Sequence, residues 1–403
     1  MKNLKDIIHP SQAKDLYGVF NDSFPPILDG VTLTVENYVY WLQKSGKTPC
    51  VVTPWNPVCN DFPYEVLRFF SLPIYSRRPY RYGYPKIDPF IWRKIRESDF
   101  KIVHAHCPFS SGRLGVYAKK KKGIPLIGTF HSKYRDDLEH SMRHVPWMVN
   151  YIMGRIIDFY NSCDEVWIPQ AHVEETVREY GYKGNLIVME NGNDMASFIK
   201  GNVKEYKRQA KKELGIPEGH LSLLFVGQHI WEKGTDVVVE TLKLLKGRIP
   251  YTMNFVGTGY AAGEIANRIK EYGLQDSVRM NGVIEDRDTL SRYYAAADLF
   301  LFPSFYDNAP LVIREAAAMG TPSILLSGST ASEVISDRNN GFLTEKSPEE
   351  FARLVEFLYH HPEALDKAAK GAHETLVKSW QKVVEEVIDR YDTLIAANER
   401  RVK

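Results

Sequence analysis

Two carboxylates lie eight residues apart around the start of a predicted helix, in the stretch YDNAPLVIREAAAMGT, residues 306–321. Asp307 precedes this helix, and Glu315 lies about a turn and a half inside it. Pro310 is predicted in the first helical turn and Gly320 at its left-handed end. The first acid can accept hydrogen bonds from hydroxyl groups, and the second can accept two vicinal hydroxyls such as those of a ribose. The structural alternative is that Asp307 is an N-cap and Glu315 a partner of the helix dipole.

The entrance of this helix is a candidate anion site. Its residues are Asn308, Ala309, Pro310 and Leu311. Except at the proline, the backbone amides here can face a negatively charged ligand, because the first amides of a helix have no partner within it. The apolar run ADLFLFPS comes directly before this stretch. The acids and amides are therefore predicted to follow a buried strand.

Two further strands are predicted to end in glycine loops, LLFVGQHIWEKGTD and NFVGTGY. Gly227 and Gly257 would let the backbone approach an oxygen-rich ligand closely. Lys233 precedes a helix-like run and can reach a diphosphate as a point charge. The alternative is that both glycines simply turn the chain.

The elements that must position these residues alternate along the whole chain. Short apolar runs alternate with helical patterns, which predicts parallel strands joined by crossover helices. The pattern restarts after a charged helical stretch that follows Asn191-Gly192. We therefore predict an α/β fold of two doubly wound domains, residues 1–192 and 193–378, and a final amphipathic helix over 379–403. Ligands of such folds bind outside the carboxyl ends of the strands.

Composition limits the class of protein. The chain has 403 residues, of which 44% are hydrophobic and 25% charged, and this is typical of folded domains rather than disorder. Four scattered cysteines without metal-ligand spacing favour a reducing compartment. The amino terminus carries charges where a signal peptide needs an apolar core, and no stretch has the length of a transmembrane helix. These features predict a cytoplasmic protein.

Basic residues are concentrated between Arg68 and Lys122, where 14 lysines and arginines stand against three acids. Within this segment, RFFSLPIYSRRPYRYGYPKIDPFIWRKIR interleaves aromatic residues with arginines. That mixture suits peripheral contact with an anionic membrane, since aromatic rings favour the headgroup level and cations meet lipid phosphate. The alternative is a solvated basic face whose aromatic residues belong to the core. Nucleic acid is not expected as a partner, because no nucleic-acid motif accompanies the segment.

Three motifs in the second half, taken in order, resemble the donor domain of family 4 glycosyltransferases, which are retaining enzymes of the GT-B fold. They are VGQHIWEKG, FVGTG and DNAPLVIREAAAMGTP. The first half agrees: Gly30 matches a family glycine that meets the donor phosphate, and His131 matches a histidine beside the transferred sugar. NGND resembles the family's interdomain signature, and the final helix resembles one that crosses back to the first domain.

The resemblance implies a role for each site residue. Lys233, the amides near Asn308 and Leu311, and the Gly30 loop would stabilise charge on the leaving diphosphate. Glu315 would hold the ribose and Asp307 the sugar, and His131 would orient a sugar hydroxyl, whereas a satisfied core histidine is the alternative. The remaining donor-binding residues would be Gly227, Gln228, Gly257 and Ala309. The family mechanism implies no obligatory protein nucleophile. These residues require no metal, because no acidic pair lies at metal-binding spacing, and the nucleotide-sugar is a co-substrate, so no cofactor is expected.

Two residues depart from the family pattern. Gln228 stands where the family usually has an arginine, so one cation on the diphosphate is missing. Asp307 stands where the family usually has glutamate and is one methylene shorter. A UDP-glucose-like donor is preferred.

For the acceptor, the basic-aromatic segment and TFHSKYRDD resemble parts of bacterial diacylglycerol glucosyltransferases. This implies a lipid acceptor at the inner face of the cell membrane, with Tyr134, Arg135 and Asp136 near its entry. A soluble glycan or small-molecule acceptor is the alternative. Two other classes stay open: a nucleotide-sugar-binding protein without turnover, and a membrane-surface scaffold.

Overall fold

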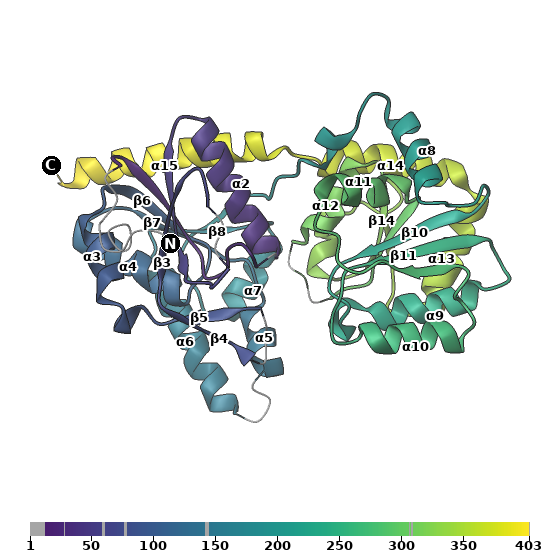
Figure 1. Ribbon diagram of the computed structural model, residues 1–403, viewed down its shortest axis with the longest axis horizontal. Helices are drawn as coiled ribbons and strands as arrows, with labels where there is room; N and C mark the ends of the chain where they lie inside the picture. The colour runs from purple at the N-terminus through teal and green to yellow at the C-terminus, as the bar shows by residue number, and fades with distance from the viewer. Residues whose placement is uncertain are drawn as a thin grey trace. The chain divides into compact units, whose positions relative to one another are not determined.

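The described part of the computed structural model divides into two compact units (Figure 1). The structure describes residues 13–402 apart from 28, 59–60, 76–78, 142–144, 306 and 308. The first unit runs to Asn191 and takes up the chain again from Trp380, and the second unit is Gly192–Ser379. Each unit is built on one main parallel sheet with helices on both faces.

The first unit has its strands in the order β3-β2-β1-β6-β7-β8-β9, and all neighbours pair in parallel. β4 and β5 form a separate antiparallel hairpin. The strands are β1 Leu16–Phe20, β2 Thr48–Pro54, β3 Glu65–Phe69, β4 Ser71–Pro73, β5 Arg81–Gly83, β6 Phe100–Ala105, β7 Leu126–Thr129, β8 Glu165–Ile168 and β9 Leu186–Val188. The helices are α2 Gly30–Lys44, α3 Pro89–Glu97, α4 Ser110–Lys122, α5 Tyr134–Ser141, α6 Pro146–Ser162, α7 Val173–Glu179 and α15 Trp380–Val402, with a 3₁₀ turn at Pro85–Ile87.

The second unit has the strand order β12-β11-β10-β13-β14-β15, again all parallel. Its strands are β10 Leu221–Val226, β11 Tyr251–Val256, β12 Val278–Met280, β13 Leu299–Phe302, β14 Ser323–Leu326 and β15 Phe342–Thr344. Its helices are α8 Val203–Glu213, α9 Thr235–Leu245, α10 Ala262–Glu271, α11 Arg287–Ala296, α12 Leu311–Ala318, α13 Pro348–His360 and α14 Pro362–Leu376. Short 3₁₀ turns span Met195–Phe198, Trp231–Lys233 and Thr330–Val334.

The two faces of β10 show why an unbroken apolar run forms a central strand. Leu223 and Phe225 pack in a core shared with α9, α10 and α13. Leu224 and Val226 point to the other face, into a core shared with α11, α12 and α14. Since successive side chains alternate across a strand, both faces must be apolar when helices cover both. Figure 1 shows these two helix layers on either side of the sheet, and the predicted doubly wound architecture is confirmed.

Each sheet has a point where the strand order reverses. In the first unit β1 is followed by β2 on one side and later by β6 on the other, and in the second unit β10 has β11 on one side and β13 on the other. Loops leaving the carboxyl ends of such strands diverge and leave room for a ligand. The loops after β10 and β13 carry Lys233 and Asp307.

The final helix returns to the first unit, as predicted. α15 packs against α2 and β6, and Figure 1 shows it, in yellow, lying along that unit. Its Tyr391 is fully buried, stacks on Trp167 and lies with its Oη 2.6 Å from His104 Nδ1. None of the described helices is long and apolar enough to cross a membrane.

The helix after β13 begins one residue later than predicted. Pro310 is its N-cap rather than part of the first turn, and α12 starts at Leu311. The extended backbone at Pro310 fits the fixed φ of proline while leaving the helix to begin behind it. Gly320 has φ +68°, which confirms the predicted left-handed end.

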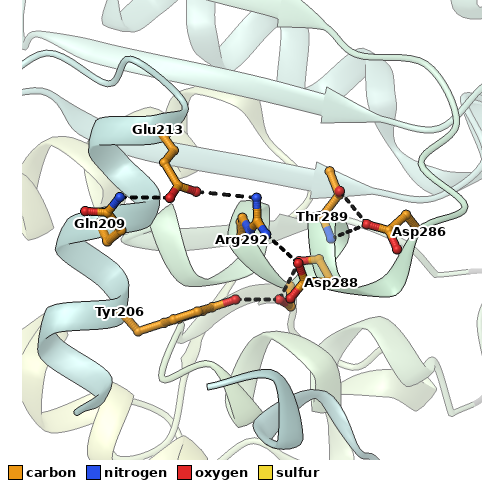
Figure 2. A network of polar contacts seen from close by, with 8 residues as sticks. Tyr206, Gln209, Glu213, Asp286, Asp288, Thr289 and Arg292 are labelled. Carbon is orange, nitrogen blue, oxygen red and sulfur yellow. Dashed lines mark hydrogen bonds and ion pairs between the residues drawn. The ribbon is translucent and has the colours of Figure 1, made fainter. Parts of the chain in front are cut away.

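A network of polar contacts joins α8 to α11 (Figure 2). Arg292 of α11 pairs with Asp288 and lies with its Nη1 3.6 Å from Glu213 Oε2 of α8. Tyr206 Oη is 2.8 Å from Ser291 Oγ. These bonds supplement the packing of α11 against α8.

Candidate active site

The two glycine loops of the second unit lie against each other. Gly227 N donates to Val256 O, at the end of β11, over 3.0 Å, whereas Gly257 N donates to Gly282 O, in the segment after β12, over 2.7 Å. Gly257 has φ +127°, and a Cβ there would lie 2.0 Å from Gly227 O. A side chain is thus excluded by both the backbone conformation and the close approach. Gly257 is required for this contact between loops and does more than turn the chain.

His229 lies between the loops and was not singled out from the sequence. Its backbone N donates to Thr258 O over 2.9 Å, and its O accepts from Ala261 N over 3.0 Å. The ring is fully buried beside Phe225 and Phe255, and this burial lowers the pKa of His229. His229 therefore serves to hold the loops in place.

Lys233 and Asp307 form an ion pair across the point where the strand order reverses. Ser304 Oγ donates to the other carboxylate oxygen of Asp307 over 2.8 Å. The side chains of Lys233 and Asp307 are 14% and 16% exposed, so both are mostly buried but still reachable from solvent. A carboxylate has about four acceptor positions, so Asp307 can accept from a ligand as well as from Lys233 and Ser304.

A second contact fixes the same two loops. Gly234 has φ +71°, and a Cβ there would lie 2.2 Å from Pro303 O. The loop after β10 therefore passes directly against the loop after β13 at this glycine. In the sequence EKG, the lysine supplies the ion pair with Asp307, and the glycine allows the loop after β10 to pass close to Pro303.

The other donor residues predicted here are distributed around this pair. Gln228 is exposed, and its side chain is open to solvent. Ala309 and Leu311 are half-buried, and the N-cap Pro310 makes no side-chain capping bond. The first amides of a helix have no partner within it, so those at the start of α12 can face an anionic ligand. Asn308 lies outside the described residues.

Glu315 is 5% exposed and is held by two residues of α11. Tyr294 Oη donates to its Oε2 over 2.7 Å, and Arg287 Nη2 lies 2.8 Å from its Oε1. The carboxylate is therefore paired inside the unit, as burial of a charge requires. Two of its acceptor positions are not used by Tyr294 and Arg287, which is the number that a vicinal diol needs. Neither Arg287 nor Tyr294 was identified from the sequence.

His131 of the first unit belongs to a stack of three imidazoles. It follows β7, and its Nε2 lies 3.0 Å from Nδ1 of His106, which follows β6. His104 stacks on His106 with ring centroids 4.1 Å apart and lies with its Nε2 2.6 Å from Thr129 Oγ1. Burial lowers the pKa of His131 to about 4, and it also lowers the pKa values of His104 and His106 well below the usual value for histidine. All three rings are neutral near pH 7.

The other predicted residues of the first unit have different environments. Gly30 is the exposed first residue of α2, after the N-cap Asp29, so its backbone is accessible. Tyr134 is a correction: it is buried in the core, and its Oη accepts from Tyr160 Oη over 3.3 Å, so it supports the fold rather than lining an acceptor entry. Arg135 is half-buried, with Nη1 3.2 Å from Asn150 Oδ1, and Asp136 is exposed.

Across the described parts of the chain, no three His, Cys, Asp or Glu side chains are grouped as ligands for a metal ion. The three imidazoles of the stack face one another and the hydroxyls of Tyr391 and Thr129.

The histidine stack predicts a loss of stability in mild acid. Folding lowers the pKa of each ring, so between about pH 6.5 and 4 the unfolded chain binds protons that the folded chain does not. Stability is therefore complete above about pH 6.5 and falls as the pH decreases. Between pH 7.5 and pH 5.5, each ring is expected to lower the free energy of unfolding by about 1.4 kcal/mol, so the three rings together lower it by about 4 kcal/mol.

Urea unfolding at these two pH values measures the effect. His131→Asn is expected to remove about a third of the difference, since it deletes one of the three titrating rings. His172→Asn is the control, because His172 is exposed and should leave the difference unchanged. An unfolding free energy that stays constant between pH 7.5 and 5.5 would contradict a neutral buried stack.

Comparison with known proteins identifies the family. Residues 28–197 match the model described as Glycosyltransferase Family 4, and residues 206–375 match that described as Glycosyl transferases group 1. The first match lies in the first unit except for its last residues, and the second lies within the second unit.

Whole-chain relatives agree with these matches. The chain is 25% identical over 388 residues to an alpha-monoglucosyldiacylglycerol synthase of Streptococcus pneumoniae, covering 94% of this chain and 86% of that protein. It is 27% identical over 332 residues to a D-inositol 3-phosphate glycosyltransferase of Nocardiopsis dassonvillei, covering 75% of this chain and 74% of that protein. The crystal structure of Anabaena HepE in complex with UDP and glucose has a TM-score of 0.74 at 16% identity, covering 93% of this chain and 99% of that one. The chain belongs to the group 1, family 4 glycosyltransferases of the GT-B fold.

Proposed function

We propose that this glycosyltransferase moves a hexose from a UDP-sugar to a hydroxyl group of a membrane lipid, with retention at the anomeric carbon. The observation that carries the donor half of the proposal is the Lys233–Asp307 pair at the point of strand reversal. A cation, free helix amides and glycine loops at that position suit a nucleoside diphosphate.

The leaving diphosphate defines what the second unit must do. Charge grows on the leaving oxygen as the bond to the sugar breaks, and preorganised donors in a site with little water stabilise it most. Lys233 and the amides at the start of α12 would fill this role, and Gly30 would add backbone donors from the first unit. Gln228 supplies an amide donor in place of a cation.

The sugar and ribose would be bound by the remaining polar groups. Glu315 would accept the two ribose hydroxyls, and Asp307 would accept from the sugar through the acceptor positions not taken by Lys233 and Ser304. His131 is neutral at physiological pH and would exchange one hydrogen bond with a sugar hydroxyl. Retention would follow when the acceptor attacks from the face that the diphosphate leaves, with the leaving phosphate taking the proton.

A lipid acceptor is supported by the surface of the basic-aromatic segment, residues 68–122. Several of its large apolar side chains are exposed instead of forming the core: Phe70, Leu72, Tyr75, Tyr82, Tyr84, Ile87 and Phe90. Exposed aromatic groups among cations are what an interfacial surface needs. The Streptococcus pneumoniae relative is named for a glucosyl-diacylglycerol product. By contrast, the Nocardiopsis relative is named for an inositol phosphate acceptor, which keeps a soluble acceptor as the second candidate.

The test is a transfer assay with the purified full chain. UDP-glucose, UDP-galactose and GDP-mannose are each offered with diacylglycerol in phosphatidylglycerol vesicles, and separately with inositol phosphate in solution. We expect a glycolipid with a UDP-hexose, whose anomeric configuration is read by NMR. Transfer to inositol phosphate alone would establish the soluble alternative. Binding of UDP-sugars without transfer or hydrolysis would establish a nucleotide-sugar-binding protein instead.

Co-sedimentation with vesicles tests the membrane contact in the same preparation. The chain is expected to sediment with phosphatidylglycerol vesicles at low salt and to be partly released as salt screens the basic segment. Failure to bind anionic vesicles at low salt would contradict the lipid acceptor. A membrane-surface scaffold would bind the vesicles but gain no thermal stability from UDP.

A further inference from the structure

Glu315 is held by partners that the family motif does not contain. Arg287 and Tyr294 both lie on α11, while Glu315 lies on α12. Arg287 takes one carboxylate oxygen at 2.8 Å and Tyr294 takes the other at 2.7 Å. Because each oxygen is fixed by a different donor, the carboxylate cannot rotate without breaking one of the two bonds.

The burial of this group makes its pairing necessary. Tyr294 is fully buried, whereas the Arg287 side chain keeps 37% of its surface exposed. A buried carboxylate that lacks a cation destabilises the folded state, so without Arg287 the Glu315 carboxylate would rotate toward other hydrogen-bond donors. Arg287 thus lies at the solvent side of the carboxylate and Tyr294 at the core side.

α11 is itself held at its start and along the side that contacts α8. Asp286 caps its start by accepting from Thr289 N over 2.9 Å. The network in Figure 2 attaches its outer side to α8 through Arg292 and Ser291. Arg287 therefore projects from a helix that is tied to the rest of the unit by its cap and by its contacts with α8. Positions set by rigid elements give precise geometry at a ligand site.

We propose that Arg287 is a positioning residue that makes the site selective for ribonucleotides over 2′-deoxyribonucleotides. With Tyr294 it orients the Glu315 carboxylate so that its two remaining acceptor positions face a vicinal diol. A nucleotide that lacks the 2′-hydroxyl leaves one of these positions unpaired, so it binds more weakly. This inference rests on the proposed nucleotide-sugar site, and Arg287 acts through Glu315 without touching the nucleotide.

The experiment compares the dissociation constants of UDP and 2′-deoxy-UDP by calorimetry. The wild-type chain is expected to prefer UDP by about 10- to 100-fold, the range for one hydrogen bond to a charged group. In Arg287→Met the preference should fall to within about threefold, because the carboxylate is no longer fixed. Arg353→Met is the matched control: it removes a surface arginine of α13 that pairs with Glu350 and takes no part in fixing α11, and it should keep the wild-type preference.

Each result decides between the inference and the proposed function. A wild-type preference that survives unchanged in folded Arg287→Met would overturn the inference and leave the nucleotide site intact. If Arg287→Met does not fold, Tyr294→Phe decides, because it removes the other donor without removing a charge. An undiminished preference in Tyr294→Phe would overturn the inference equally. Absence of UDP binding to the wild-type chain would instead contradict the proposed function.

Discussion

Replacement of Lys233 by methionine is expected to lower kcat for sugar transfer by about 100- to 1,000-fold, the usual effect of removing one preorganised donor from a developing charge. The lysine ends the loop after β10 and pairs with Asp307 in surroundings where both side chains are mostly shielded from water. Its charge is therefore weakly screened and acts strongly on the leaving diphosphate. Because position 228 is a glutamine and not an arginine, Lys233 must supply more of the positive charge that stabilises the diphosphate.

Steady-state kinetics with the donor found active measure this effect, and a thermal melt shows whether the variant is folded. Lys243→Met is the control, since Lys243 lies on the following helix α9 and pairs with Glu240 on its surface. It should keep wild-type kcat. Wild-type turnover in Lys233→Met would show that the diphosphate is stabilised elsewhere, and the role assigned to the Lys233–Asp307 pair would be wrong.

Replacement of Gly257 by alanine is expected to destabilise the second unit by at least about 3 kcal/mol. Two effects add: φ +127° is strained for a residue with a side chain, and the new Cβ would lie 2.0 Å from Gly227 O. Relief requires the two glycine loops to separate, which breaks the bond from Gly227 N to Val256 O nearby. UDP binding should be lost together with stability.

Urea unfolding, monitored by circular dichroism, measures the free energy of unfolding, and calorimetry measures UDP binding. Gly263→Ala is the matched control, because this glycine lies in the first turn of α10 with nothing within 4 Å of a new Cβ. Alanine there should be neutral or stabilise the unit by up to about 1 kcal/mol. Equal stability of Gly257→Ala and the wild-type chain would mean that the loops are not in contact as described.

The predicted acceptor residues show that position in a motif does not determine whether a side chain is exposed. Tyr134, Arg135 and Asp136 are consecutive, yet the first is buried beneath the start of α5 and the third is exposed. A helix turns successive side chains by about 100°, so neighbours in sequence face different surroundings. Arg135 and Asp136 remain predicted acceptor residues, whereas Tyr134 is better regarded as part of their support.

Local patterns in the sequence were enough to predict the architecture. Alternating apolar runs and helical periods specify strands covered on both faces, and these short-range signals depend little on distant residues. The left-handed end at Gly320 followed from the same kind of information, because a backbone conformation is a property of one residue. Proximity of the motif residues to the carboxyl ends of strands was therefore predictable.

Tertiary structure alone decided which charged groups are paired. Lys233 and Asp307 are 74 residues apart, and Tyr294 and Glu315 are 21 apart on different helices. A sequence pattern shows which face of a helix is buried but not which helix covers it, so it could not assign Arg287 to Glu315 or join three histidines into one stack. Burial then set the protonation of those histidines, because the cost of placing a charge away from water depends on every neighbouring element.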